Sequence, residues 1–319
     1  MGVQTFVCQF AADVARDLRR TPKQLNAQYL YDALGSSLFD AICRLPWYRI
    51  TRAEEQLLSR HAEEIVATVL EDRAHATIVE LGVGSGEKLT TLVEALPLTS
   101  MAHVHLIDIS AAALEATAVR LAQFPHVSVV RHEGTYEEGL HEIGRDTTSG
   151  TKLVLFLGSN IGNFDAPDAE TLLRGIRRTL APQDRLLLGA DLVKPAADLI
   201  LAYDDPLGVT AAFNRNLLVR INRELGGDFD LAAFAHRAIW NEREHRVEMH
   251  LVCRTPQDVS IPAADLRVHF DAGESIWTES SYKYTERAIV ELGADARFAA
   301  SRQWVDADAG FALTLFEAI

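Results

Sequence analysis

The sequence predicts a doubly wound α/β domain that is interrupted by an inserted segment. Short runs rich in Val, Ile and Leu alternate with segments of helical periodicity, and turn-forming or polar residues bound each run. Helical patterns cover 111–123 and 168–181. Near-continuous apolar strands separated by helices form a parallel sheet that is buried on both faces. The five expected strands are residues 77–81, 103–108, 127–131, 152–157 and 185–190.

Flanking segments extend this pattern at both ends. Upstream, Thr51-Arg52-Ala53-Glu54 is a capping-box sequence, which predicts a long amphipathic helix that ends near Leu70. Downstream, residues 285–293 fit a helix, and further strands are expected at 299–305 and 311–317. A turn at 306–310 joins these two strands, so we expect the sheet to end in a β-hairpin.

The segment 197–285 departs from the alternation of strands and helices. Residues 229–240 fit a helix, whereas 246–253 and 265–270 alternate as half-exposed antiparallel strands do. Residues 1–50 carry an unusual density of aromatic side chains. We therefore expect two domains, one formed by residues 51–196 with 286–319 and the other by residues 1–50 with 197–285.

Composition and charge exclude several classes of function. The 319 residues include 45 acidic and 31 basic ones, a net charge of -14, so the chain repels nucleic-acid phosphates. No apolar stretch reaches the roughly 18 residues that a membrane span needs. The three cysteines are far apart and form no CxxC pair, which fits a reducing cytoplasm. No feature indicates dimerisation, so we expect a cytoplasmic monomer.

Two kinds of catalytic site are also absent from the sequence. The eleven histidines form no HExxH pattern, so we expect no metal site. A Gly-x-Ser-x-Gly elbow is missing too, which excludes a serine hydrolase of that type.

A glycine-rich turn follows the first expected strand of the sheet. Gly82, Gly84 and Gly86 follow Glu80 with the spacing G-x-G-x-G, and Glu87 stands where a nicotinamide fingerprint has its last glycine. Glycines at this point allow a tight turn and let the backbone approach a ligand. This spacing is associated with S-adenosylmethionine (SAM) sites. Asp108 ends the second strand, 22 residues past Gly86, where a carboxylate is expected to bind ribose hydroxyls.

A second ligand-binding loop is expected after the fourth strand, at residues 157–164. This loop contains two glycines and two asparagines, which favour close approach of a ligand and amide hydrogen bonds. We expect Asn163 to hold a carboxylate or an amine of the substrate. The polar and aromatic stretches 202–216 and 277–284 resemble surface turns if periodicity alone is considered.

Six residue runs together resemble the histidine Nα-methyltransferases of ergothioneine biosynthesis. The most specific is Tyr-Asp-Asp-x-x-Gly-Val-Thr-Ala-Ala-Phe-Asn-Arg-Asn, at 203–216. The resemblance implies a class I (Rossmann-like) SAM-dependent methyltransferase domain with an inserted α+β substrate domain. It also implies SAM as methyl donor and L-histidine as acceptor, methylated three times to hercynine. The six runs, in chain order, are 31–36, 44–52, 80–82, 158–163, 203–216 and 278–283.

The resemblance also implies roles for individual residues. Tyr31 is the candidate nearest to the catalytic role of accepting a proton from the α-amine, although an ordinary phenol, with a pKa of about 10, is an awkward base. Glu279 and Ser281 would bind the two imidazole nitrogens, with Met249 lining the same pocket. The resemblance also implies that Lys88 contacts SAM. The residues implied to hold the amino and carboxylate groups are Tyr31, Tyr48, Asn163 and Tyr203.

The chain departs from the family pattern mainly at the donor site. Thr135 and Tyr136 align with an adenine-binding Asp-Phe pair, so an adenine-binding carboxylate is replaced by a threonine. Glu133 and Glu137 are candidates to replace that carboxylate. These changes bear on the affinity for the donor more than on the choice of histidine.

Two alternative functions stay open. The first is a SAM-dependent methyltransferase for another α-amine, such as a tryptophan derivative. Glu279 and Ser281 argue against it, because an indole offers only one N–H. The second is a SAM-binding protein without enzymatic activity. The four residues that match the family's amino and carboxylate contacts argue against this second alternative.

Overall fold

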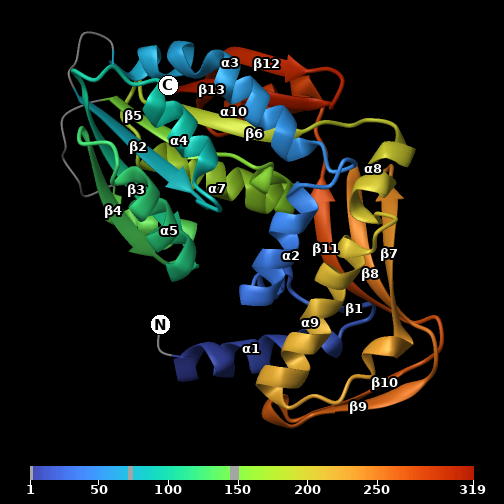
Figure 1. The fold of residues 1–319 in the computed structure, drawn as a ribbon. Coiled ribbons are helices and arrows are strands. Elements are labelled where there is room, and N and C mark those ends of the chain that lie inside the picture. The colour runs from blue at the N-terminus through green and yellow to red at the C-terminus, as the bar shows by residue number, and fades with distance from the viewer. Residues whose placement is uncertain (1–2, 71–74, 144–150) are drawn as a thin grey trace. The chain divides into compact units, whose positions relative to one another are not determined.

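The computed structural model describes residues 3–70, 75–143 and 151–319 and divides into two compact units (Figure 1). The first, here called the insertion unit, contains Met1–Arg49 and Lys194–Tyr282. The second, the α/β unit, contains Ile50–Val193 and Lys283–Ile319. The boundaries expected from the sequence lie one to three residues from these. We predict that the α/β unit binds SAM and that the insertion unit binds the substrate.

The α/β unit is built on a seven-stranded sheet with the order β12-β13-β6-β5-β2-β3-β4. Neighbours among β2 to β6 are parallel, whereas β13 is antiparallel to both β6 and β12. All seven strands expected in this unit are confirmed, including the final hairpin. The strands are β2 (His75–Leu81), β3 (Met101–Asp108), β4 (Val127–Glu133), β5 (Thr151–Phe156), β6 (Arg185–Asp191), β12 (Phe298–Asp306) and β13 (Phe311–Ala318).

Helices cover both faces of this sheet, as predicted. The α6, α7 and α10 helices share one core cluster with β2, β5, β6 and β13. The α3 helix packs against the sheet strands and against α4. No described helix is long and apolar enough to cross a membrane. The helices are α3 (Ile50–Leu70), α4 (Glu87–Glu94), α5 (Ala111–Leu121), α6 (Tyr136–Ile143), α7 (Ala166–Arg178), α10 (Glu286–Asp295) and the 3-10 helix η2 (Asn160–Asn163).

The strand order reverses beside β2, which pairs with β3 on one side and β5 on the other. In an open α/β sheet, ligands bind outside the carboxyl ends of the strands at such a switch point. The two loops singled out in the sequence follow β2 and β5 directly. The fold therefore places both loops at the expected ligand-binding edge.

The capping box expected at the start of α3 is wrong. The helix begins at Ile50, so Thr51 lies inside it rather than before it. Glu54 is fully buried instead of capping the helix. It lies on the same helix face as Leu57 and Leu58, which pack in the core.

The insertion unit contains a four-stranded sheet, β1-β11-β8-β7, and a two-stranded sheet, β10-β9. All its pairings are antiparallel except β1 with β11. The expected strands at 246–253 and 265–270 are confirmed. The strands are β1 (Lys23–Gln24), β7 (Phe234–Asn241), β8 (Arg246–Cys253), β9 (Gln257–Ile261), β10 (Leu266–Phe270) and β11 (Ser275–Tyr282).

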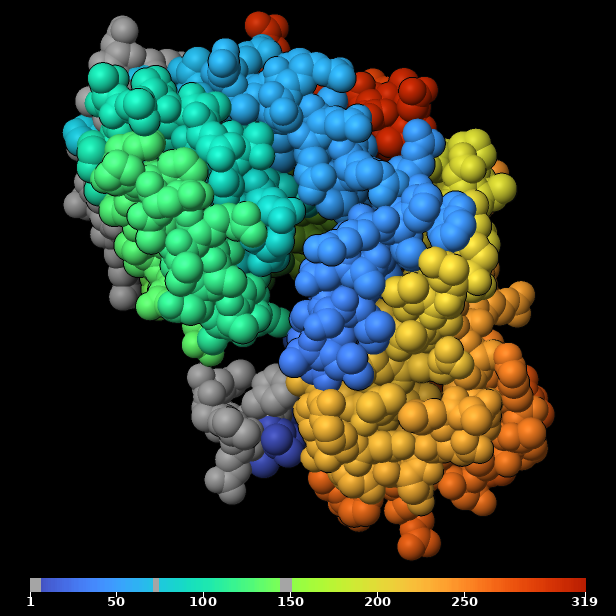
Figure 2. All heavy atoms as spheres, viewed as in Figure 1, coloured from blue at the N-terminus to red at the C-terminus, as the bar shows by residue number. Residues whose placement is uncertain are grey.

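Helices of the insertion unit pack on this sheet and on one another. The α9 helix contacts β7, β8 and β9, and it lies beside α2 (Figures 1 and 2). The helices are α1 (Val3–Leu18), α2 (Ala33–Cys43), α8 (Ala196–Tyr203) and α9 (Val209–Leu225). Short 3-10 helices are η1 (Ala27–Leu30), η3 (Leu231–Ala233) and η4 (Pro262–Ala264).

One expectation for this unit is wrong, and one interpretation from periodicity alone holds only in part. Residues 229–240 form η3 and β7 rather than a helix, because residue-by-residue pairing with β8 overrides the helical propensity of this Ala-rich stretch. The interpretation of 202–216 from periodicity alone, as a surface turn, holds only for 204–208; the rest is the end of α8 and the start of α9. Asn214 and Asn216 are buried in α9, and such buried polar residues hide the helical pattern of apolar positions.

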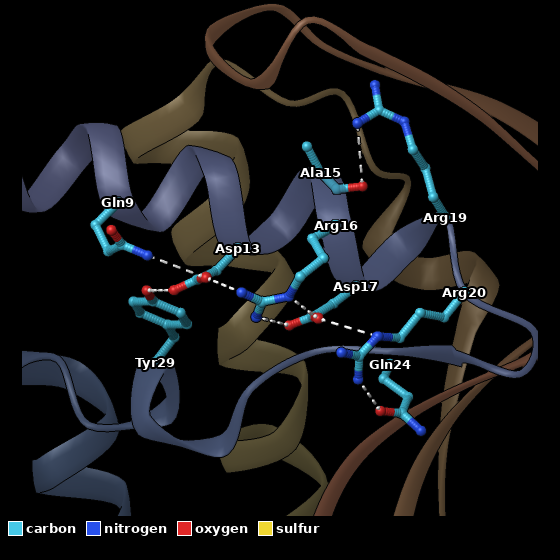
Figure 3. Close-up of polar contacts among 9 residues, drawn as sticks. All are labelled: Gln9, Asp13, Ala15, Arg16, Asp17, Arg19, Arg20, Gln24 and Tyr29. Atoms are coloured by element: carbon cyan, nitrogen blue, oxygen red, sulfur yellow. Dashed lines mark hydrogen bonds and ion pairs between the residues drawn. The ribbon is translucent and has the colours of Figure 1, made fainter.

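The α1 helix is tied to the segment that precedes Tyr31. The Tyr29 hydroxyl donates a hydrogen bond of 2.6 Å to the Asp13 carboxylate, and Arg16 pairs with the same carboxylate (Figure 3). Arg220 of α9 donates to the Tyr29 carbonyl over 2.9 Å. Burial, followed by the hydrogen bond to Asp13, raises the pKa of the Tyr29 phenol, which keeps it a donor. These contacts fix the backbone that leads into Tyr31.

Candidate functional site

The glycine turn after β2 adopts a backbone that favours glycine at three positions. Gly82, Gly84 and Gly86 have φ values of 76°, 51° and 70°. A Cβ on Gly86 would lie 2.7 Å from the Thr117 side chain. A side chain at any of the three would therefore strain the turn. The backbone remains open to a ligand at Gly84, where a Cβ would meet nothing within 4 Å.

Asp108 fastens the end of β3 to this turn. Its carboxylate accepts hydrogen bonds from the backbone N–H of Val83 over 2.9 Å and of Ser110 over 2.8 Å. Burial raises the pKa of Asp108, and backbone hydrogen bonds oppose the rise. The structure therefore brings Asp108 and the glycine turn together, as expected from their places in the sequence.

Tyr136 lies over the first glycine of the turn. A Cβ on Gly82 would be 2.9 Å from the Tyr136 hydroxyl oxygen, and the ring packs edge-on against Phe156 with 5.6 Å between centroids. Burial, followed by the charge of Asp108, raises the pKa of the Tyr136 phenol. Tyr136 is therefore a neutral hydroxyl beside the turn.

Thr135 pairs with Glu138 at the start of α6. Its N–H donates to the Glu138 carboxylate over 2.9 Å, and the Glu138 N–H donates to the Thr135 hydroxyl over 3.3 Å. This reciprocal pair is a capping box at the start of α6. Glu133 and Glu137, the candidates to replace the carboxylate, are both exposed.

Glu54 is a site residue that the sequence interpretation missed. Its carboxylate is 0% exposed, forms an ion pair with Lys88 and accepts the Gly158 N–H over 2.8 Å. A Cβ on Gly189 would come within 1.9 Å of the Glu54 carboxylate, so glycine there makes room for it. The signal in the sequence that could have identified Glu54 is its position as an acidic residue on the apolar face of a predicted helix.

Glu80 is a second buried carboxylate, at the end of β2. It is 3% exposed, and its Oε2 has no hydrogen-bond partner among the described residues. Burial raises the pKa of Glu80 to about 8; the positive charge of Lys88 opposes the rise, and the negative charge of Asp108 adds to it. A buried carboxylate oxygen without a partner, beside the glycine turn, is suited to a cationic or hydrogen-bond-donating ligand.

The loop after β5 is held at three successive points. Glu54 accepts the Gly158 N–H, and the Ser159 hydroxyl accepts the Asp191 N–H over 2.9 Å. The Tyr284 hydroxyl donates to the Ile161 carbonyl over 3.3 Å. Asn163 ends this loop in an exposed position. The α/β unit thus presents Asn163 from a well-anchored backbone.

Asp191 also forms a buried ion pair with Lys283. The two charged groups are 2.9 Å apart, with side-chain exposures of 1% and 0%. Lys283 lies in the run 278–283 that resembles the methyltransferase family. Lys283 directly follows β11, the strand that carries Glu279 and Ser281. Its ion pair fastens the residue after this strand to the end of β6.

Three tyrosines singled out in the sequence lie in one aromatic cluster of the insertion unit. The Phe39 ring contacts Tyr31 and Tyr48, with centroid distances of 5.6 and 6.2 Å. Tyr48 in turn contacts Tyr203 at 6.1 Å. Tyr31 also packs edge-on against Phe213 of α9. The cluster links the runs 31–36 and 44–52 with the end of α8.

Tyr203 connects this cluster to the sheet. Its hydroxyl donates to the Ser281 hydroxyl of β11 over 2.8 Å, a buried hydrogen bond. Glu279 lies opposite Met249 of β8, and Ser281 lies opposite Val247. Residues directly opposite each other on paired strands share a face of the sheet. Six of the seven expected substrate-binding residues therefore belong to the insertion unit, and Asn163 belongs to the α/β unit.

The other polar residues of the run 203–216 form a scaffold. Asp205 accepts three backbone N–H groups at the start of α9, from Leu207, Val209 and Thr210. Asn216 donates to the Asp32 carboxylate over 2.7 Å. Asp32 in turn caps α2 by accepting the Gly35 N–H. The scaffold fixes the residues that flank Tyr31 and Tyr203.

His236 of β7 is a second residue that sequence interpretation missed. Its Nδ1 accepts from the Asn214 amide over 2.9 Å, and its Nε2–H donates to the Tyr203 carbonyl over 2.7 Å. The same amide donates to the His250 carbonyl, which fixes its orientation. Burial lowers the pKa of His236, so the neutral ring fits this pattern. No local sequence pattern predicts these contacts.

Comparisons with known proteins agree on one family. The family model described as "Histidine-specific methyltransferase, SAM-dependent" matches residues 10–318. The chain is 44% identical to histidine N-alpha-methyltransferase of Mycolicibacterium smegmatis, an alignment that covers 95% of this chain and 93% of the relative. It is 43% identical to the Mycobacterium tuberculosis protein of that name, with the same coverage. A 4-dimethylallyltryptophan N-methyltransferase of Epichloe festucae var. lolii is 27% identical over 92% of this chain and 90% of its own length.

Proposed function

Because the chain belongs to the SAM-dependent, histidine-specific methyltransferase family, we propose that it methylates the α-amine of L-histidine. Membership makes the protein a SAM-dependent N-methyltransferase with a class I, Rossmann-like domain, and SAM is its methyl donor. A SAM-binding role without catalysis is thereby excluded. The acceptor, the number of transfers and the residue roles are the proposed part.

The residues around the glycine turn fit SAM. Gly84 leaves its backbone accessible, and the Asp108 carboxylate can accept hydrogen bonds from ribose hydroxyls. The buried Glu80 carboxylate and Lys88 supply one negative and one positive group for the amino-acid end of the donor. Tyr136 would lie over the turn with its neutral hydroxyl. The bound donor supplies an electrophilic methyl group on its sulfonium.

The observation that carries the histidine proposal is the placement of Glu279 and Ser281 on the Met249 face of the sheet. A carboxylate accepts one imidazole N–H, and a hydroxyl serves the other ring nitrogen as donor or acceptor. Buried polar groups of this kind penalise substrates that leave them unpaired. An indole offers one N–H only, so a tryptophan derivative would satisfy this pair less well.

The acceptor nitrogen must lose a proton before it can attack the methyl group. An α-amine is mostly protonated at neutral pH because its ordinary pKa is about 8. We assign acceptance of this proton, directly or through water, to Tyr31. Tyr48, Tyr203 and Asn163 would hold the amino and carboxylate groups so that the nitrogen points at the methyl.

Three transfers would complete the reaction. After the first two methylations the nitrogen still carries a proton that can be removed, and its lone pair can attack again. The trimethylated nitrogen has neither, so the product is Nα,Nα,Nα-trimethylhistidine (hercynine). Aromatic faces stabilise such a methylated ammonium, and Phe39 and Phe213 supply them beside Tyr31. This product places the enzyme in ergothioneine biosynthesis.

The test is a mass-spectrometric methylation assay with purified enzyme and SAM. The panel of free amino acids includes histidine, tryptophan, 4-dimethylallyltryptophan and tyrosine. We expect histidine alone to gain three methyl groups. Methylation of a tryptophan derivative in preference to histidine would refute the assignment of Glu279 and Ser281 while leaving the donor and the fold in place.

A further inference from the structure

Side chains along a strand point alternately to the two faces of the sheet, and in β11 this alternation is interrupted between Trp277 and Glu279. Trp277 lies opposite His250 of β8, and Glu279 lies opposite Met249, the next residue of β8. Thr278 is the additional residue, so the strand contains a β-bulge at this point. The remaining partners are Ser275 with Val252, Ile276 with Leu251, Ser280 with Glu248, Ser281 with Val247 and Tyr282 with Arg246.

The bulge decides which face of the sheet carries the proposed imidazole-binding pair. With regular alternation from Trp277 onward, Glu279 would lie opposite Glu248 and Ser281 opposite Arg246. Both side chains would then share the face of Trp277. The single extra residue moves them to the Met249 face, and it also avoids two carboxylates directly opposite each other.

Two side-chain hydrogen bonds hold the bulge. The Trp277 indole N–H donates to the Glu279 carbonyl over 3.0 Å. The Thr278 hydroxyl donates to the Met249 carbonyl over 2.9 Å, and this bond is buried. One bond closes the bulge within β11, and the other fastens it to β8.

The Trp277 ring is itself held by side chains on its own face of the sheet, the face opposite the one that carries Met249. The Arg246 guanidinium lies over the ring, 4.6 Å from its centroid, and the His250 ring stacks beside it at 6.1 Å. Arg246 is fixed by hydrogen bonds to Glu248 over 2.8 Å and to the Tyr282 hydroxyl over 2.7 Å. The indole N–H is therefore aimed at the bulge by neighbours on the face opposite Glu279.

We propose that Trp277 is a positioning residue for histidine specificity, which acts by locking the bulge that directs Glu279 and Ser281 to the Met249 face. The inference rests on the proposed function, because it concerns the side chains that would bind the imidazole. Trp277 itself need not touch the substrate.

The decisive variant is Trp277→Phe, which keeps an aromatic ring under Arg246 and removes the indole N–H. Losing this hydrogen bond should raise the KM for histidine about three- to tenfold. The Kd for SAM should stay unchanged, since the glycine turn lies in the α/β unit. The matched control is Trp304→Phe in β12 of the α/β unit, for which both constants should match the parent enzyme.

A double-mutant cycle separates positioning from general stabilisation. If Trp277 acts through Glu279, Trp277→Phe should have little effect on the KM in a Glu279→Ala background.

The outcomes that would overturn the inference are distinct from failure of the proposed function. Normal histidine methylation by the parent enzyme, with an unchanged KM for Trp277→Phe, overturns the positioning role alone. Equal effects of Trp277→Phe with and without Glu279 overturn it as well. A parent enzyme that methylates no histidine overturns the proposed function, and this inference with it.

Discussion

The carboxylate of Glu54 in α3 forms a buried ion pair with Lys88 in α4 and also accepts the backbone N–H of Gly158. One buried group thus joins the helix after the glycine turn to the loop that ends at Asn163. The two loops that flank the switch point of the sheet, beside β2 and β5, therefore share an anchor. Displacing the anchor should disturb both loops.

Replacing Glu54 by Gln should destabilise the protein by about 2 kcal/mol. The amide can still accept the Gly158 N–H, but Lys88 loses its counter-charge. Breaking fully buried pairs costs roughly 3–5 kcal/mol, and the 21% exposure of the Lys88 side chain reduces that figure. Urea unfolding measures the change. Glu64→Gln, which removes an exposed pair with Arg302 from the same helix, should cost less than about 0.5 kcal/mol. Equal losses in the two variants would contradict the role of Glu54.

Replacing Glu80 by Gln should change how stability depends on pH. Burial raises the pKa of Glu80 from 4.5 to about 8. The folded state then holds a proton that the unfolded state has released, so this carboxyl makes the protein less stable as pH rises from about 4.5 to about 8. Glu80→Gln has no proton to lose. Its stability relative to the parent should therefore increase across this range and level off above it, as measured by unfolding at a series of pH values. A constant difference across the range would show that Glu80 titrates normally.

Binding of SAM should release a proton near neutral pH if Glu80 faces the donor's cationic end. A cation favours the ionised carboxylate and so lowers the pKa of Glu80. Calorimetry at pH 7 in buffers of different ionisation enthalpy measures the proton count. The released proton should disappear in Glu80→Gln, and an equal release in both proteins would assign it to another group.

Replacing Glu279 by Ala should lower kcat/KM for histidine about a hundredfold, because the imidazole N–H loses a charged acceptor. The Kd for SAM should not change. Steady-state methylation rates and calorimetry give the two values. Glu244→Ala, an exposed residue of the same unit, serves as the control and should behave as the parent. Unchanged histidine turnover in Glu279→Ala would refute the proposed acceptor site.

Replacing Tyr31 by Phe should reduce kcat about a hundredfold and leave SAM binding intact, because the proton acceptor is lost while the ring packing on Phe39 and Phe213 remains. The variant should also recover rate as pH rises, since more of the α-amine is then already neutral. Single-turnover rates across pH 7 to about 10 test this. A uniform loss at every pH would indicate that Tyr31 binds the substrate without taking the proton.

The α/β unit could be predicted from sequence because its central strands β2, β5 and β6 are buried along most or all of their length. Every residue of β6 is buried, and its run of apolar residues between polar ends is visible without any tertiary information. The glycine turn and Asp108 could be located for the same reason, since their places follow from the strand order.

The insertion unit could not be predicted in the same way. The α9 helix buries Asn214 and Asn216, whose partners His236 and Asp32 lie far away in the sequence. The role of His236 also depends on contacts between distant elements, which local periodicity does not contain, and the same holds for Glu54 in the α/β unit. The bulge at Thr278 is a property of strand pairing, so it becomes visible only when β8 is placed beside β11.

The position of β13 has a consequence for how the protein forms during synthesis. This strand lies between β12 and β6, yet it is translated after the whole of the insertion unit. Until then the edge of β6 that pairs with β13 leaves its backbone N–H and C=O groups unpaired on the ribosome, beside the apolar side chains of 186–188. Exposed edges of this kind template the association of nascent chains. We expect chaperones to bind this edge, and ribosome-stalled chains that lack β13 to aggregate more readily than those that include it.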